Sequence, residues 1–164
     1  MDTFDAIAKR RSVRKYKATA VPRDLVEKVV DAGRRAPTAM NVQPWEFVVI
    51  TDPQMRKSLA EMCDYGKFFA EAPVCIATFC KDTKYYLEDG CAAIENMLIA
   101  AAALELGACW VAGDKKDYAA AIAQKLAAPA GFRLVGLVAL GYPADAGKPT
   151  EKRPLAKVIH WEKW

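Results

Sequence analysis

The chain has 164 residues, of which 53% are hydrophobic and 27% are charged, and its formal net charge is +4. This length and balance fit a single domain, residues 1–164, with a hydrophobic core, and they exclude a disordered chain. Since the longest apolar stretch, Met97 to Leu104, is too short to cross a membrane and the charged first residues do not form a signal peptide, we expect a soluble, cytoplasmic protein.

The hydrophobic pattern predicts alternating helices and strands. Apolar residues at helical spacing predict helices over residues 2–9, 22–35, 52–62, 85–106 and 118–126. Apolar and β-branched runs predict strands over residues 46–51, 74–80, 108–112 and 134–140, and residues 66–73 are compatible with a helical turn. Elements in this order are typical of a sheet sandwiched between helices.

The predicted helix over residues 85–106, which we expect Gly107 to end, has very few polar residues after Asn96. A helix that is apolar on nearly all sides must be covered on all of them, by its own domain or by a second subunit. The tail needs cover too, because it closes with Trp161 and Trp164. Docking on a partner subunit would bury these side chains.

The cysteines and the histidine limit the chemistry that the side chains can perform. The five cysteines form no CxxC pair and are scattered among apolar residues, which is typical of reduced, buried thiols. His160 is the single histidine, and no cysteine lies near it at ligand spacing, so neither a zinc site nor a histidine-based triad is expected. A cofactor is therefore the natural source of reactivity.

A basic run places six positive charges between Lys9 and Lys17. The guanidinium groups of Arg10, Arg11 and Arg14 suit phosphate oxygens, and the Ser12 hydroxyl can add a neutral hydrogen bond. The same run is also compatible with a solvated helix end or with the basic arm of a nucleic-acid-binding module.

Three further segments carry candidate site residues. The loop PTAMNVQPW offers Thr38, Asn41 and Gln43 between two prolines, and it is either a recognition loop for a flat heterocycle or a packed turn. In GACWVAGD, the amides of Ala112 and Gly113 can donate to a ring, although a simple turn at a strand end would look the same. Lys152-Arg153 could close over a phosphate or remain solvated.

These segments, in this order, resemble the nitroreductase family. RRSVRKY is similar to its N-terminal phosphate motif, APTAMNVQPWEFVVI to its characteristic loop and strand, and WVAG, GYP and KRPLAKVIHWEKW complete the pattern. No GxGxxG follows a strand and no GxxxxGK[ST] is present, so other nucleotide motifs lack support. The resemblance implies an α+β fold, a three-layer α/β/α sandwich with a mixed central sheet, in an intertwined homodimer with two FMN molecules at its interface.

The resemblance also implies which residues contact FMN. Some would hold the phosphate, others would line the ring from the second subunit, and a strand end would face the redox-active nitrogen. The implied set is Arg10, Arg11, Ser12, Arg14, Pro37, Thr38, Ala39, Asn41, Ala112, Gly113 and Arg153. Lys67 is a further mid-chain candidate. Glu151 stands where some relatives carry a basic residue, so the contact from the tail rests on Arg153.

The implied mechanism is ping-pong. NADH or NADPH reduces the flavin and leaves, and a nitroaromatic, a quinone or a related small-molecule acceptor takes its place. The flavin carries the chemistry, so no catalytic side chain and no metal is expected, in agreement with the single histidine.

Other functions stay open at the level of sequence. Reductive dehalogenases and flavin-consuming enzymes share the fold but usually add a lid, and no insertion here is long enough for one. A basic nucleic-acid-binding module is disfavoured, because the other basic residues alternate with acids and no recognition motif occurs. A flavoprotein that has lost catalysis would differ only in turnover.

Overall fold

One antiparallel sheet forms the centre of the computed structural model, which describes residues 1–145, 147 and 150–164. Its strands, in the spatial order β1-β2-β4-β3, are β1 (Trp45–Ile50), β2 (Val74–Lys81), β3 (Gly107–Ala112) and β4 (Phe132–Gly141). The two central strands, β2 and β4, are almost wholly buried, which explains their near-continuous apolar runs. Strands β1 and β3 are the two edges of the sheet.

The four strands form an antiparallel sheet and not the mixed sheet that we predicted. All pairings between the four strands are antiparallel. Among the described residues, the one parallel pairing is an isolated bridge between Ser12 and Ala108. The segments that join β1 to β2 and β3 to β4 do not cross the sheet. Each of them starts the next strand at the end of the sheet where the preceding strand stopped, so the two strands run in opposite directions.

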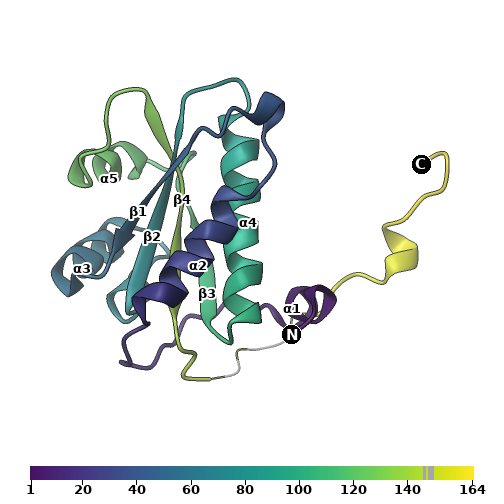
Figure 1. The fold of residues 1–164 in the computed structure, drawn as a ribbon, viewed down its shortest axis with the longest axis horizontal. Coiled ribbons are helices and arrows are strands. Elements are labelled where there is room, and N and C mark those ends of the chain that lie inside the picture. Colours follow the sequence, from purple (N-terminus) through teal and green to yellow (C-terminus); the bar gives the residue numbers. More distant parts are fainter. Residues whose placement is uncertain (146, 148–149) are drawn as a thin grey trace.

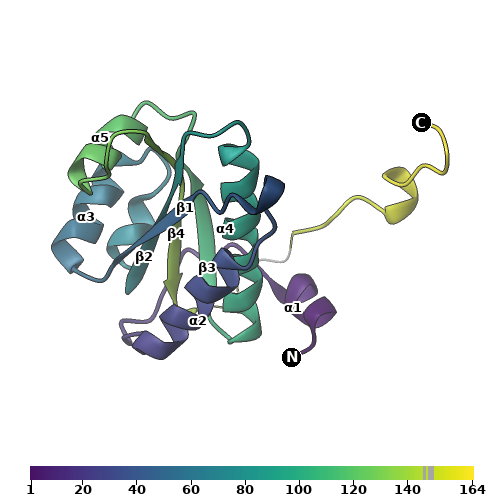
Figure 2. The ribbon, with the colours of Figure 1, turned by 45° about the horizontal axis from the view of Figure 1, so that its top comes forward.

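Helices cover both faces of the sheet (Figures 1 and 2). Helices α2 (Arg23–Arg34) and α4 (Tyr86–Ala103) pack on one face, and α3 (Pro53–Met62), the turn η2 (Lys67–Ala70) and α5 (Ala119–Lys125) pack on the other. Successive side chains of β2 alternate between these two cores, as the pleat of a strand requires. The three-layer α+β sandwich expected from the resemblance is thus confirmed.

The predicted helix boundaries are close to the observed ones, with one correction. Helix α1 spans Thr3–Lys9, and its cap is Asp2, whose carboxylate accepts hydrogen bonds from the amides that follow it. Helix α4 ends at Ala103, before the predicted Leu106. Glu105, with a φ of 60°, turns the chain into the left-handed region, so Glu105 and not Gly107 ends the helix. Gly107 already belongs to β3.

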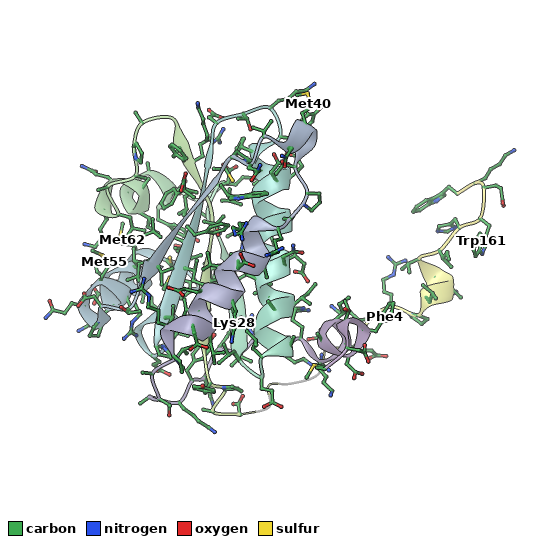
Figure 3. The ribbon with its side chains drawn as sticks, viewed as in Figure 1. Phe4, Lys28, Met40, Met55, Met62 and Trp161 are labelled. Carbon is green, nitrogen blue, oxygen red and sulfur yellow. The ribbon has the colours of Figure 1, made fainter. Side chains whose placement is uncertain are left out.

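The C-terminal tail leaves the body of the molecule (Figure 1). Residues 150–164 are exposed throughout and include the short turn η3 (Leu155–Lys157). Trp161, which is 77% exposed, lies far from the sheet (Figure 3). The tail therefore carries apolar side chains that its own chain does not cover. Among the described residues, none of the helices is long and apolar enough to cross a membrane.

A substitution at Gly90 tests the packing of α4 on the sheet. A Cβ placed on Gly90 would lie 2.6 Å and 2.9 Å from the two Cγ atoms of Val135, so rotation of that side chain cannot relieve the clash. Alanine would gain about 1 kcal/mol of helix propensity, but overpacking costs about 1–3 kcal/mol. We expect Gly90→Ala to lower the free energy of unfolding in urea, whereas the half-buried neighbour Cys91→Ala should change it less. A more stable Gly90→Ala variant would contradict this packing.

Candidate functional site

The basic segment docks along the free edge of β3. Ser12 forms the parallel bridge with Ala108, and the Val13 amide donates to the Ala108 carbonyl over 3.0 Å. Val13 packs against Gly107, where a Cβ would lie 2.8 Å from the valine side chain. The buried Tyr16 donates its hydroxyl to the Val13 carbonyl over 2.5 Å. The apolar residues of the segment thus anchor it, and its charged residues remain at the surface.

The guanidinium groups of this segment keep donors available. Arg10 lies 3.8 Å from Glu95, in a loose ion pair. Arg11 donates to the carbonyls of Ala8 and Arg10, and Arg14 has only a long contact of 3.4 Å with the Ser12 carbonyl. Within the described part of the chain, neither Arg11 nor Arg14 forms an ion pair. Their charges are therefore free to hold an anion.

The hydrogen-bond pattern of β3 decides which backbone groups face its free edge. The Gly113 amide donates to the Val135 carbonyl over 3.1 Å, inside the sheet. Because residues of an antiparallel pair alternate in their bonding, Ala108 and Ala112 turn their backbone groups outward. Two contacts agree with this: the Ala108 carbonyl accepts from Val13, and the Ala112 carbonyl accepts from Tyr118.

Of the two amides expected to face a ring, only that of Ala112 is therefore turned toward the edge. The Gly113 amide is occupied within the sheet, and a Cβ on Gly113 would lie 2.7 Å from Leu134. The glycine is required for close packing against β4. Ala108 and Ala112 are about 13 Å apart along the strand, a span that suits an elongated ligand with its phosphate beside the arginines and its ring beside Ala112.

The loop of residues 63–68 contacts both the segment that follows β3 and the basic segment. Lys116, from the segment after β3, lies 3.7 Å from Asp64 and 5.7 Å from the centroid of the Tyr65 ring. At the other end of the loop, Arg14 lies 6.0 Å from the centroid of the Phe68 ring. The loop thus runs from the basic segment to the end of β3. Lys67 lies in this loop, with its ammonium group bonded to the Glu61 carbonyl.

Burial sets the protonation of three titratable groups on or near β3. It raises the pKa of Tyr118 to about 12 and the pKa of the Cys63 thiol to about 11. Burial also raises the pKa of Cys109, although the nearby charge of Arg14 opposes this shift. These groups are neutral at neutral pH, so the positive charge of the site comes from its arginines and lysines.

A cavity of about 200 Å³ lies beside the basic segment, lined in part by Arg10, Arg11, Val13 and Ala108. Ligand pockets commonly measure about 300–1,000 Å³. The cavity can take a phosphate group but not a tricyclic ring, so a ring would have to lie farther along the edge of β3.

The structure does not bring the other expected residues to this edge. The loop with Pro37, Thr38, Ala39 and Asn41, which includes the turn η1 (Ala39–Asn41), lies at the end of α4 opposite to α1 (Figure 1). Arg153 lies in the outstretched tail, where it donates to the Lys157 carbonyl over 2.8 Å. A single chain therefore assembles only part of the expected site.

The remote loop has an unusual backbone. Met40, Asn41 and Gln43 have φ values of 53°, 55° and 51°, in the left-handed region. The Gln43 amide donates to the Thr38 hydroxyl over 3.2 Å, which helps to hold this conformation. Met40 is 92% exposed at the tip (Figure 3). Strain of this kind is concentrated at functional sites.

Sequence reasoning missed the residues that support the end of β3. Asp114 accepts a hydrogen bond from the Tyr86 hydroxyl at 2.8 Å and lies 3.0 Å from Arg133. Tyr118 bonds to the Ala112 carbonyl over 2.6 Å. No local pattern marks these contacts, since each joins residues whose meeting depends on the fold.

Comparison with known proteins identifies the family of the chain. The model of the nitroreductase family matches residues 7–72 and 64–142. The chain belongs to the nitroreductase family. A family relative from Methanothermobacter thermautotrophicus, named as a candidate NADH dehydrogenase/NAD(P)H nitroreductase, is 34% identical over 100% of this chain and 88% of its own length.

Solved structures of nitroreductase-like proteins share the fold. A candidate NADH dehydrogenase/NAD(P)H nitroreductase from Bacteroides thetaiotaomicron superposes with a TM-score of 0.94 at 30% identity, over 99% of this chain and 98% of that one. A candidate nitroreductase from Desulfovibrio desulfuricans, solved in complex with FMN, has a TM-score of 0.88 at 34% identity, over 100% of this chain and 98% of its own.

Paired glycine substitutions test the strain in the loop of residues 38–43. A left-handed conformation costs a non-glycine residue about 1–2 kcal/mol, whereas an added glycine makes the unfolded chain freer by about 0.4–1 kcal/mol. Met40→Gly should therefore raise the free energy of unfolding in urea slightly. Ala39→Gly, at an ordinary φ, should lower it. Equal losses in both variants would show that the loop stores no strain.

Proposed function

We propose that this protein is an FMN-dependent oxidoreductase that uses NADH or NADPH to reduce nitroaromatic, quinone or related small acceptors. Residues 1–164 would form one FMN-binding domain. The observation that carries the proposal is the free edge of β3, with unpaired guanidinium groups at one end and an outward-facing amide at the other. FMN in the Desulfovibrio desulfuricans relative supports the same cofactor here.

The residues of this edge fit the chemistry of FMN. Arg10, Arg11, Arg14 and Ser12 would hold the phosphate dianion through charge-assisted and neutral hydrogen bonds. Ala112 would donate its amide to the ring, and Lys67 would add positive charge near it. Donors and cations there stabilise the negative charge of a reduced flavin.

When bound, the flavin would accept hydride from the nicotinamide and pass the electrons on to the acceptor. The protein's task is to bind and orient both partners in turn at one exposed ring face, which is why we propose a ping-pong order. The free, mostly buried cysteines suit a cytoplasmic location, where thiols stay reduced.

We propose that a second copy of the chain completes the site. The loop with Pro37, Thr38, Ala39 and Asn41 lies too far from the basic segment of its own chain, and it would line the ring of its partner. Arg153, in the outstretched tail, would approach a phosphate in the same way. The tail presents exposed apolar residues and the outer side of α4 presents half-buried ones such as Ile99, and an intertwined homodimer would bury both.

The phosphate assignment is tested with Arg10→Ala combined with Arg14→Ala. Each lost charge-assisted hydrogen bond costs about 1.5–3 kcal/mol, so FMN should bind about a hundredfold more weakly or worse. Flavin absorbance per chain and turnover with NADH, NADPH and a panel of acceptors measure this. The matched control, Arg23→Ala with Arg34→Ala, removes two exposed charges from α2. Stoichiometric flavin in the first double variant would overturn the assignment.

The role of the tail is tested with Leu155→Ala combined with Trp161→Ala. If both side chains are buried against a partner, their loss removes about 3 kcal/mol or more of apolar burial and should shift the dimer toward monomer in sedimentation equilibrium. Lys163→Ala, in the same tail, should leave the dimer intact. An unchanged association constant in the double variant would show that the tail does not join the subunits.

A further inference from the structure

The end of β3 is held rigidly through consecutive hydrogen bonds. The peptide between Ala112 and Gly113 is fixed from both sides, because its carbonyl accepts from the Tyr118 hydroxyl and its amide donates to Val135. The next carbonyl, that of Gly113, accepts from the Lys116 amide over 3.1 Å. The Ala112 amide belongs to the preceding peptide, and the alternation along the strand turns it toward the free edge of the sheet.

Tyr118 is the side chain that contacts this peptide from the outer side. It lies just before α5 and is only 9% exposed, so solvent does not compete for its hydroxyl. Its distance to the Ala112 carbonyl, 2.6 Å, is that of a well-formed hydroxyl bond. The raised pKa of Tyr118, about 12, keeps the phenol protonated and therefore a donor at neutral and moderately alkaline pH.

We propose that Tyr118 is a positioning residue that orients the Ala112 amide toward the flavin and thereby raises the reduction potential of the bound cofactor. This inference rests on the proposed function. Tyr118 itself does not reach the ring. It holds the Ala112–Gly113 peptide and thereby limits rotation of the backbone at Ala112, whose own amide lies in the preceding peptide. A donor aimed at developing negative charge is effective only when its orientation is fixed in advance.

Tyr118→Phe removes the hydroxyl and keeps the ring that fills the core. The control is Tyr85→Phe, which makes the same chemical change in an exposed side chain at the start of α4. The first readout is hydrogen exchange at the Gly113 amide in the proteins as purified. We expect exchange about tenfold faster in Tyr118→Phe, because the peptide loses one of its two restraints, and no change in Tyr85→Phe.

The second readout is the reduction potential of bound FMN, measured by equilibration with reference dyes. We expect the equilibrium constant for two-electron reduction to fall about tenfold in Tyr118→Phe, which corresponds to about 30 mV. Flavin content should stay equal to that of the wild type. A purely structural role of Tyr118 would change stability but not this potential.

The outcomes separate the inference from the function on which it rests. Faster exchange with a lower potential supports the positioning role. An unchanged potential overturns it, and so do unchanged exchange at Gly113 and loss of flavin from Tyr118→Phe alone. If the wild-type protein itself binds no FMN, the proposed function fails first, and the inference fails with it.

Discussion

The attachment of the N-terminal segment to the edge of β3 is the constraint on which the candidate site depends. Val13 bonds to the Ala108 carbonyl and packs where Gly107 leaves room for it. This contact covers the first part of the edge and leaves the rest of the strand open. It also places the arginines on either side of Val13 at a defined distance from the strand end, so charge and amide are presented together.

The period of two along β3 gives the strand two roles. Residues whose amides point inward bond to β4 and stabilise the sheet, as Gly113 does with Val135. Residues in between turn outward, where Val13 and Tyr118 take up two of their carbonyls. A ligand on this edge therefore meets backbone groups that are already held in place, at no cost in stability to the sheet.

The same architecture leaves the site incomplete in a single chain. The strained loop around Met40 and the tail with Arg153 lie apart from the basic segment. Both carry exposed apolar side chains, such as Met40 in the loop and Trp161 near the end of the tail. The association of two copies of the chain would thus both bury these apolar side chains and complete the site.

Much of the fold could be read from the sequence by itself, because spacing and composition are local. The alternating elements, the buried strands β2 and β4, the basic run and the loop of residues 37–45 all follow from neighbouring residues. The end of α4 at Ala103, followed by the left-handed turn at Glu105, did not, since such turns are not confined to glycine. Tertiary structure alone decided that Ala112 and not Gly113 faces the edge, and that Tyr118 and Asp114 support it. These contacts depend on strand register and on which distant segments meet, and no local pattern encodes either.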